Sequence, residues 1–160
     1  MKSASAIAAA ISLSFLTLSA AGQPTPQPTA PKEPYSLGFA EFMIFTQIRH
    51  AKLWIAGDAR NWELADYQID ELKEGLEDAA KHFPTYKDVP VGKMIEFNMN
   101  TPIADVEGAV KARDRAKFVA AFDRLTAACN TCHQSANRPF IVIQRPTAAP
   151  YSNQSFAPKR

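Results

Sequence analysis

The sequence predicts an all-α protein whose folded part is an antiparallel bundle of four helices. Three observations lead to this fold class. Apolar residues recur at helical spacing in four segments, strand patterns are almost absent, and proline or other turn-forming residues separate the segments. Of the 160 residues, 46% are hydrophobic and 21% are charged, which is typical of one globular domain and not of a disordered chain.

The first 22 residues have the composition of a secretory signal peptide. Lys2 gives a charged start, the stretch to Ser19 is uncharged and rich in Ala, Ile, Leu and Phe, and small residues follow. An uncleaved anchor helix is the alternative, since the stretch is nearly long enough to span a bilayer. We predict that residues 1–22 are removed, that the mature chain has no transmembrane segment, and that the protein is periplasmic or otherwise exported by a bacterium.

Proline then separates the leader from the folded domain. Five of the twelve prolines fall between Gln23 and Pro34, a density that neither a helix nor a central strand tolerates. Residues 23–35 are therefore predicted to form an extended tether. The bundle is expected to occupy residues 36–138, and residues 139–160 to form a C-terminal tail.

The first predicted helix begins after Ser36, whose hydroxyl can cap the helix N-terminus. Apolar residues continue to Ala56, and Gly57 with Asp58 is expected to end the helix. Apolar positions along this segment include Phe39, Met43 and Trp54.

The second predicted helix begins at Asn61, another residue type that caps helices well. Pro84 disfavours helical geometry at the residue before it, so the helix must end by Phe83. Apolar residues at alternating spacings of four and three predict its buried face: Ala65, Ile69, Leu72, Leu76, Ala79 and Phe83.

Residues 84–100 are predicted to form a loop with one turn around residues 94–97. The third helix is expected to begin at Thr101, an N-cap residue followed by Pro102 at the first helical position, where proline is favoured. Its short apolar face consists of Ile103, Val106 and Val110.

The fourth predicted helix is capped by Asp114 and must end near Asn137, because Pro139 follows shortly afterwards. Its buried face consists of Phe118, Phe122, Leu125, Cys129 and Cys132. The apolar run from Phe140 to Ile143 has no partner strand, so we expect it to pack as extended chain against the bundle. Residues 146–160 are expected to be loosely ordered.

Both cysteines of the protein lie in one pentapeptide, Cys129-Asn130-Thr131-Cys132-His133. CxxCH is the attachment motif of c-type haem, in which the two thiols form thioethers with the vinyl groups and the histidine binds the iron. On a helix, spacings of three and four residues place Cys129, Cys132 and His133 on one face, so all three can reach one macrocycle. The sequence therefore predicts one covalently bound haem c near the end of the last helix.

The other chemistries open to two cysteines fit this chain less well. A thioredoxin-like dithiol needs a βαβ setting, and a structural zinc site needs four ligands, whereas the chain has no second CxxC. A disulfide within one helical turn would be strained. A buried pair of reduced thiols is unusual in an exported protein, because exported proteins fold in oxidising compartments.

A four-helix bundle with CxxCH near the end of its last helix resembles the cytochrome c-prime family and its low-spin relatives. The resemblance covers residues 36–138 and depends most on CNTCH. The stretch from His50 to Tyr67 also resembles small exported bacterial cytochromes of the same bundle type. One difference is Thr126, since cytochromes c-prime often have a basic residue three positions before the first cysteine.

The sixth ligand of the iron decides what such a haem can do. With His133 as the fifth ligand, the candidates outside the leader are Met43, Met94, Met99, His50 and His82. Met43 ranks first, because the first and last helices of the bundle are antiparallel. At ~1.5 Å per residue, Met43 and His133 then lie at similar depths. His50 lies about 10 Å deeper on the same face and is the alternative ligand, or a buried histidine with a hydrogen-bond partner. The resemblance also implies Met43, since low-spin relatives take a methionine from this part of the first helix.

We therefore expect an exported electron carrier that is not an enzyme, with His133 and Met43 on the iron and a protein as redox partner. A homodimer is also compatible with the sequence. The balanced charge, 18 basic against 16 acidic residues, argues against nucleic-acid binding. The alternative is a haem protein that binds nitric oxide or carbon monoxide at an open distal site, with Gln47 as a candidate pocket donor. A structural or redox-sensing subunit of a larger complex is a third hypothesis.

Overall fold

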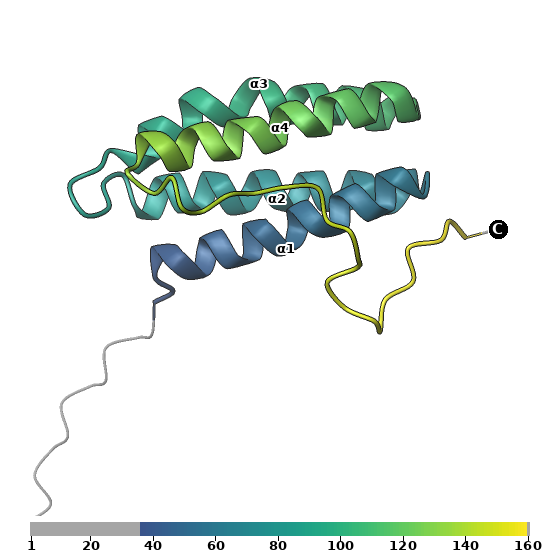
Figure 1. Ribbon diagram of the computed structural model, residues 1–160, viewed down its shortest axis with the longest axis horizontal. Coiled ribbons are helices and arrows are strands. Elements are labelled where there is room, and N and C mark those ends of the chain that lie inside the picture. Colours follow the sequence, from purple (N-terminus) through teal and green to yellow (C-terminus); the bar gives the residue numbers. More distant parts are fainter. Residues whose placement is uncertain (1–35, 160) are drawn as a thin grey trace, which may run out of the picture. The chain divides into compact units, whose positions relative to one another are not determined.

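The computed structural model describes residues 36–159, and within them the chain is an all-helical four-helix bundle (Figure 1). The helices are α1 (Phe39–Asp58), α2 (Trp62–His82), α3 (Val91–Lys111) and α4 (Arg115–Ser135). Short turns join them, so consecutive helices run in opposite directions and pack on each other, whereas the backbones of α1 and α4 seldom approach closely and these two helices meet through side chains. The described residues contain no strand, as expected. The predicted leader (1–22) and tether (23–35) lie outside the described residues.

α1 begins two residues later than the sequence predicts and ends two residues later. Its N-cap is Gly38, which provides no side-chain hydrogen bond, so the prediction that Ser36 caps it is wrong. Gly57 does not end the helix but is buried within it. The chain turns instead at Arg60, whose φ of 58° lies in the left-handed region.

Gly57 is needed where α1 meets α4. A Cβ atom at this position would lie 2.1 Å from Cζ of Phe118, whose side chain is fully buried. Gly57→Ala should therefore force the ring to move and lower the free energy of unfolding by about 1–3 kcal/mol, as overpacking does in other cores. Urea unfolding monitored by circular dichroism measures this difference.

Gly108 is the matched control for that substitution, because it also lies inside a helix but has open space around it. No atom lies within 4 Å of a Cβ built there. Gly108→Ala should raise the free energy of unfolding by about 0.5–1 kcal/mol through helix propensity alone. Equal effects at the two positions would contradict the proposed contact between α1 and α4.

α2 has the bounds and the buried face that the sequence predicts. Asn61 caps it, with Oδ1 accepting a hydrogen bond of 3.2 Å from the amide of Leu64. Five of the six predicted core positions are buried, and Phe83, just past the helix, is half-buried against the rings of Phe39 and Phe42.

α3 differs most from the prediction, because it begins ten residues before Thr101. The segment 84–100 is therefore mostly helix, and Pro102 lies in the helix interior. An interior proline costs about 3 kcal/mol. The extra turns bury Val91, Ile95 and Met99, and each such side chain contributes about 1.5–3 kcal/mol on leaving water. Burial of this face outweighs the lost hydrogen bond, so the helix continues through the proline.

α4 agrees with the prediction at both ends. Asp114 caps it by accepting a hydrogen bond of 3.0 Å from the amide of Lys117. The helix ends at Ser135, and Asn137 then reverses the chain with a φ of 59°. Phe118 and Phe122 are fully buried near its start, whereas the two cysteines near its end are only half-buried.

The chain after α4 runs back over α4 and α1 to the turn that joins α1 to α2 (Figure 1). It passes Asn130 and Asp123 of α4 and Trp54 of α1. The expectation that residues 140–143 pack as extended chain holds only in part: Ile143 bonds to Asn130 of α4, whereas Phe140 and Val142 are 76% and 69% exposed. The expectation of a loosely ordered end is wrong, because Phe156 is only 8% exposed and belongs to the hydrophobic core.

None of the helices in residues 36–159 is both long enough and apolar enough to cross a membrane.

Candidate functional site

A cavity of about 400 Å³ lies at the end of the bundle where α1 and α3 begin and α4 ends. Its walls come from all four helices, the connection between α2 and α3, and the chain that follows α4. The size is within the range of small-molecule and cofactor sites. Polar and sulfur-containing residues on its walls include Met43, Thr46, Gln47, His50, Met99, Cys129, Cys132 and His133.

The α4 wall carries the whole CxxCH motif. Cys132 and His133 follow Cys129 by three and four residues, so all three lie on one face of the helix. This face continues the buried stripe of Phe118 and Phe122. At the last turns of α4 this face lines the cavity.

Both cysteines are free thiols that line the cavity. Burial, together with the neighbouring Cys132, raises the pKa of the Cys129 thiol to about 12, and burial also raises the pKa of Cys132. Both side chains are therefore protonated at neutral pH. Thiols of redox-active CxxC pairs have the opposite property, a lowered pKa that makes a nucleophilic thiolate.

His133 is held by the chain that follows its helix. Its Nδ1 lies 3.0 Å from the carbonyl oxygen of Ile141. A carbonyl can only accept, so we assign the ring proton to Nδ1, which donates it, and leave Nε2 with a free lone pair. Metal-binding histidines characteristically have this arrangement, with the second nitrogen hydrogen-bonded to a carbonyl or carboxylate.

The α1 wall contains Met43 in the second turn of the helix, and the side chain is half-buried. Gln47, one turn further, also lines the cavity but is exposed to solvent. Thr46 is buried and donates its hydroxyl proton to the carbonyl of Phe42, 2.8 Å away, within the same helix. Met43 is thus the residue of this wall that combines a soft donor atom with partial burial near the opening.

His50 is 3% exposed and is fixed by α4. Its Nε2 lies 2.9 Å from Oγ1 of Thr126, whose own proton is directed to the carbonyl of Phe122. We therefore assign the proton of the imidazole to Nε2, which donates to Thr126. The centroids of the His50 and Phe122 rings are 4.4 Å apart, so the two rings also pack on each other. His50 is thus a buried histidine with a hydrogen-bond partner, one of the two roles that the sequence analysis considered for it. Coordination would have to use Nδ1.

Burial lowers the pKa of His50 to about 4, so the ring is neutral in the folded protein at neutral pH. The unfolded chain binds a proton at the ordinary pKa of 6.5 while the folded chain does not. Stability is therefore full above pH 6.5 and falls as the pH drops toward 4, by about 3 kcal/mol. Urea unfolding at a series of pH values should show this loss in the wild type and a much smaller loss in His50→Gln.

His82 provides the control for the pH experiment, since it is exposed at the end of α2. His82→Gln should keep the wild-type dependence of stability on pH. If His50→Gln kept that dependence as well, burial of a neutral His50 would not be its source.

Of the three remaining ligand candidates, only Met99 lines the cavity. Met99 is 3% exposed and lines the cavity from α3. Met94 lies on α3 outside the cavity wall, and His82 stacks on Phe42 outside it. The structure thus leaves Met43, His50 and Met99 around the cavity. Met99 was expected in a loop, and it reaches the cavity because α3 begins ten residues early.

Sequence reasoning missed the residues that hold the chain over the motif. Asn130, a spacer within CxxCH, makes two hydrogen bonds to the main chain of Ile143. His133 bonds to the main chain of Ile141. Main-chain partners carry no side-chain signature, and these contacts span 8 and 13 residues, so no local pattern could have indicated them.

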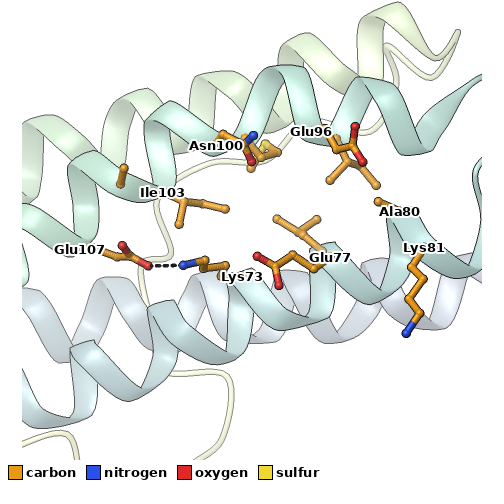
Figure 2. Close-up of a pocket in the computed structure, with 12 residues that line it drawn as sticks. Lys73, Glu77, Ala80, Lys81, Glu96, Asn100, Ile103 and Glu107 are labelled. Carbon is orange, nitrogen blue, oxygen red and sulfur yellow. Dashed lines mark hydrogen bonds and ion pairs between the residues drawn. The ribbon is translucent and has the colours of Figure 1, made fainter.

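A second depression, of about 530 Å³, lies between α2 and α3 (Figure 2). Figure 2 shows charged side chains along it, including Lys73, which bonds to Glu107 at 3.3 Å. Both signs of charge line this groove, so it has no marked preference for a charged ligand. It shares three apolar residues with the cavity, and these separate the two: Leu76, Ile95 and Met99.

Within residues 36–159, no three His, Cys, Asp or Glu side chains are grouped so as to hold a metal ion. A haem iron does not require such a group, because the porphyrin supplies four nitrogen ligands and the protein only the axial ones. Comparison with known proteins finds no matching family model, no matching curated protein and no matching solved structure.

Proposed function

We propose that this protein is an exported c-type cytochrome that transfers electrons through a single haem. One observation carries the proposal: both cysteines and the histidine of CxxCH line the same cavity as Met43. The motif would supply two attachment points and one iron ligand, and Met43 on the α1 wall would supply a second ligand. These are the groups that a bundle cytochrome requires.

The chemistry of the donor set suits haem attachment. Both thiols are reduced and protonated at neutral pH. The S–H group of Cys129 would add across one vinyl group and that of Cys132 across the other. In each addition a C–S bond forms, the thiol hydrogen goes to the neighbouring vinyl carbon, and nothing is released. A haem bound here would supply a one-electron ferric–ferrous couple.

The axial ligands in this proposal are His133 and Met43. His133 presents an unprotonated Nε2, because Nδ1 donates to Ile141. Met43 is preferred to His50, whose Nε2 is occupied by Thr126. A thioether ligand stabilises ferrous iron and raises the reduction potential relative to two histidines.

The alternative activity, binding of nitric oxide or carbon monoxide, would use the same attachment with Met43 off the iron. Gln47 on the cavity wall would then be a candidate donor to a bound gas. The two activities differ in the ligand state of the iron, so one set of spectra separates them.

The test is expression of the full chain in a bacterium with a c-type maturation system, followed by mass spectrometry and optical spectra. We expect a mass increase of one haem that survives denaturation, and a six-coordinate low-spin spectrum in both oxidation states. A mature chain without covalent haem would overturn the proposal. A five-coordinate ferrous form that binds carbon monoxide rapidly would replace electron transfer with gas binding.

A further inference from the structure

The chain that follows α4 folds back over the CxxCH motif, and we call its residues 138–145 the clamp. A turn begins it, in which the amide of Arg138 bonds to the carbonyl of His133 at 2.8 Å and that of Ile141 bonds to Arg138 at 3.0 Å. The side chains of Arg138, Ile141 and Ile143 line the cavity. The clamp therefore forms the wall next to the axial histidine.

Asn130 fixes the position of the clamp. Its Oδ1 accepts from the amide of Ile143 at 2.7 Å, and its Nδ2 donates to the carbonyl of the same residue at 2.9 Å. Two bonds to one residue set the position of the main chain along the helix, as a strand pair would. Ile141, two residues earlier, is then placed with its carbonyl 3.0 Å from Nδ1 of His133.

A second contact fixes the far end of the clamp. Arg145 bonds to the carboxylate of Asp123 through Nε at 2.7 Å, and its guanidinium lies 4.6 Å from the ring centroid of Trp54. The clamp is thus held by Asn130 at Ile143 and by Asp123 at Arg145, both of which follow Arg138 and Ile141 along the chain.

We propose that Asn130 is a positioning residue for the axial histidine. It holds the clamp so that the Ile141 carbonyl accepts the Nδ1 proton of His133, which sets the ring orientation and leaves Nε2 as the ligand. A strong acceptor on the far nitrogen increases electron donation from the ring, and this stabilises ferric iron. The variable residue of the motif therefore lowers the reduction potential. This inference rests on the proposed function, since it concerns the same haem site.

The experiment compares Asn130→Ala with Thr131→Ala in the holoprotein. Thr131 is the matched control, because it is the other variable residue of the motif and its hydroxyl bonds only to Ala127 of its own helix. We expect a more positive reduction potential in Asn130→Ala, with covalent haem content unchanged, and the wild-type potential in Thr131→Ala. Ile143→Pro removes the amide that bonds to Asn130 and should shift the potential in the same direction.

Hydrogen exchange provides a readout that does not depend on haem redox chemistry. Asn130→Ala removes both bonds to Ile143 and should speed hydrogen exchange at the Ile143 amide by about tenfold or more, whereas Thr131→Ala should leave it unchanged. Faster exchange with an unchanged potential would overturn the positioning role while leaving the cytochrome intact. Unchanged exchange would overturn the clamp itself. Absence of covalent haem from the wild type would be a failure of the proposed function, which the mass spectrum shows separately.

Discussion

Replacing both Cys129 and Cys132 with alanine should abolish covalent haem entirely. The two thiols are the only cysteines of the chain, and each provides one thioether bond. Haem that still enters the cavity would be held by its axial ligands and by apolar contacts alone. It should then be extracted by acidified organic solvent, whereas the wild-type haem should stay with the protein. Mass spectrometry of the denatured chain measures the difference directly.

The single variants sharpen this result. Cys129→Ala and Cys132→Ala should each keep one thioether, which shifts the optical spectrum of the denatured haem but retains the added mass. Thr131→Ala, on the exposed side of the same helical turn, should behave as the wild type. Retention of haem mass by the double variant would show attachment through another residue and would contradict the proposed site.

The parts of the fold that the sequence predicts correctly depend on local signals. Asn61 and Asp114 cap their helices within three residues along the chain, and Pro84 restricts the residue immediately before it. The start of α3 depends on a balance of energies instead. Pro102 is compatible with either a helix start or a helix interior, and only the burial of residues 91–99 against the other helices decides between them.

In the candidate site, too, features set by local spacing could be predicted, and features set by contacts between distant residues could not. The sequence could predict that Cys129, Cys132 and His133 share one helix face, because of their spacing, and that Met43 lines the same cavity, because antiparallel helices place it at a similar depth. Asn130 could not be predicted, since its partner is a main chain that becomes a neighbour only after the tail folds back.

The tail adds to the side-chain contacts that join α1 and α4, whose backbones seldom approach closely. Arg145 spans from Asp123 of α4 to the Trp54 ring of α1, and Phe156 enters the core near the turn at Asn61. These contacts join the two helices without bringing their backbones together. Nearer the start of α1, where the tail is anchored to α4 alone, the cavity occupies the space between the helices.

Met43→Ala should convert the haem from six-coordinate low-spin to high-spin or to a form with an exchanged ligand. Alanine removes the thioether and opens the sixth position, and no other residue in this turn of α1 can replace it without movement. The ferrous variant should bind carbon monoxide readily, whereas the wild type must first displace its methionine. Its reduction potential should fall, because ferrous iron loses a ligand that stabilises it. Absorption spectra in both oxidation states and a carbon monoxide titration measure these changes.

Met99→Ala and Met94→Ala separate ligation from packing. Met99 lines the cavity and is buried, so its truncation should lower stability by about 2–5 kcal/mol while the low-spin spectrum persists. Met94 lies outside the cavity wall, so its variant should keep the spectrum as well. A low-spin spectrum that is unchanged in Met43→Ala and lost in His50→Gln alone would assign the sixth position to His50. A low-spin spectrum lost in Met99→Ala alone would assign it to α3, and either outcome would contradict Met43 as the ligand.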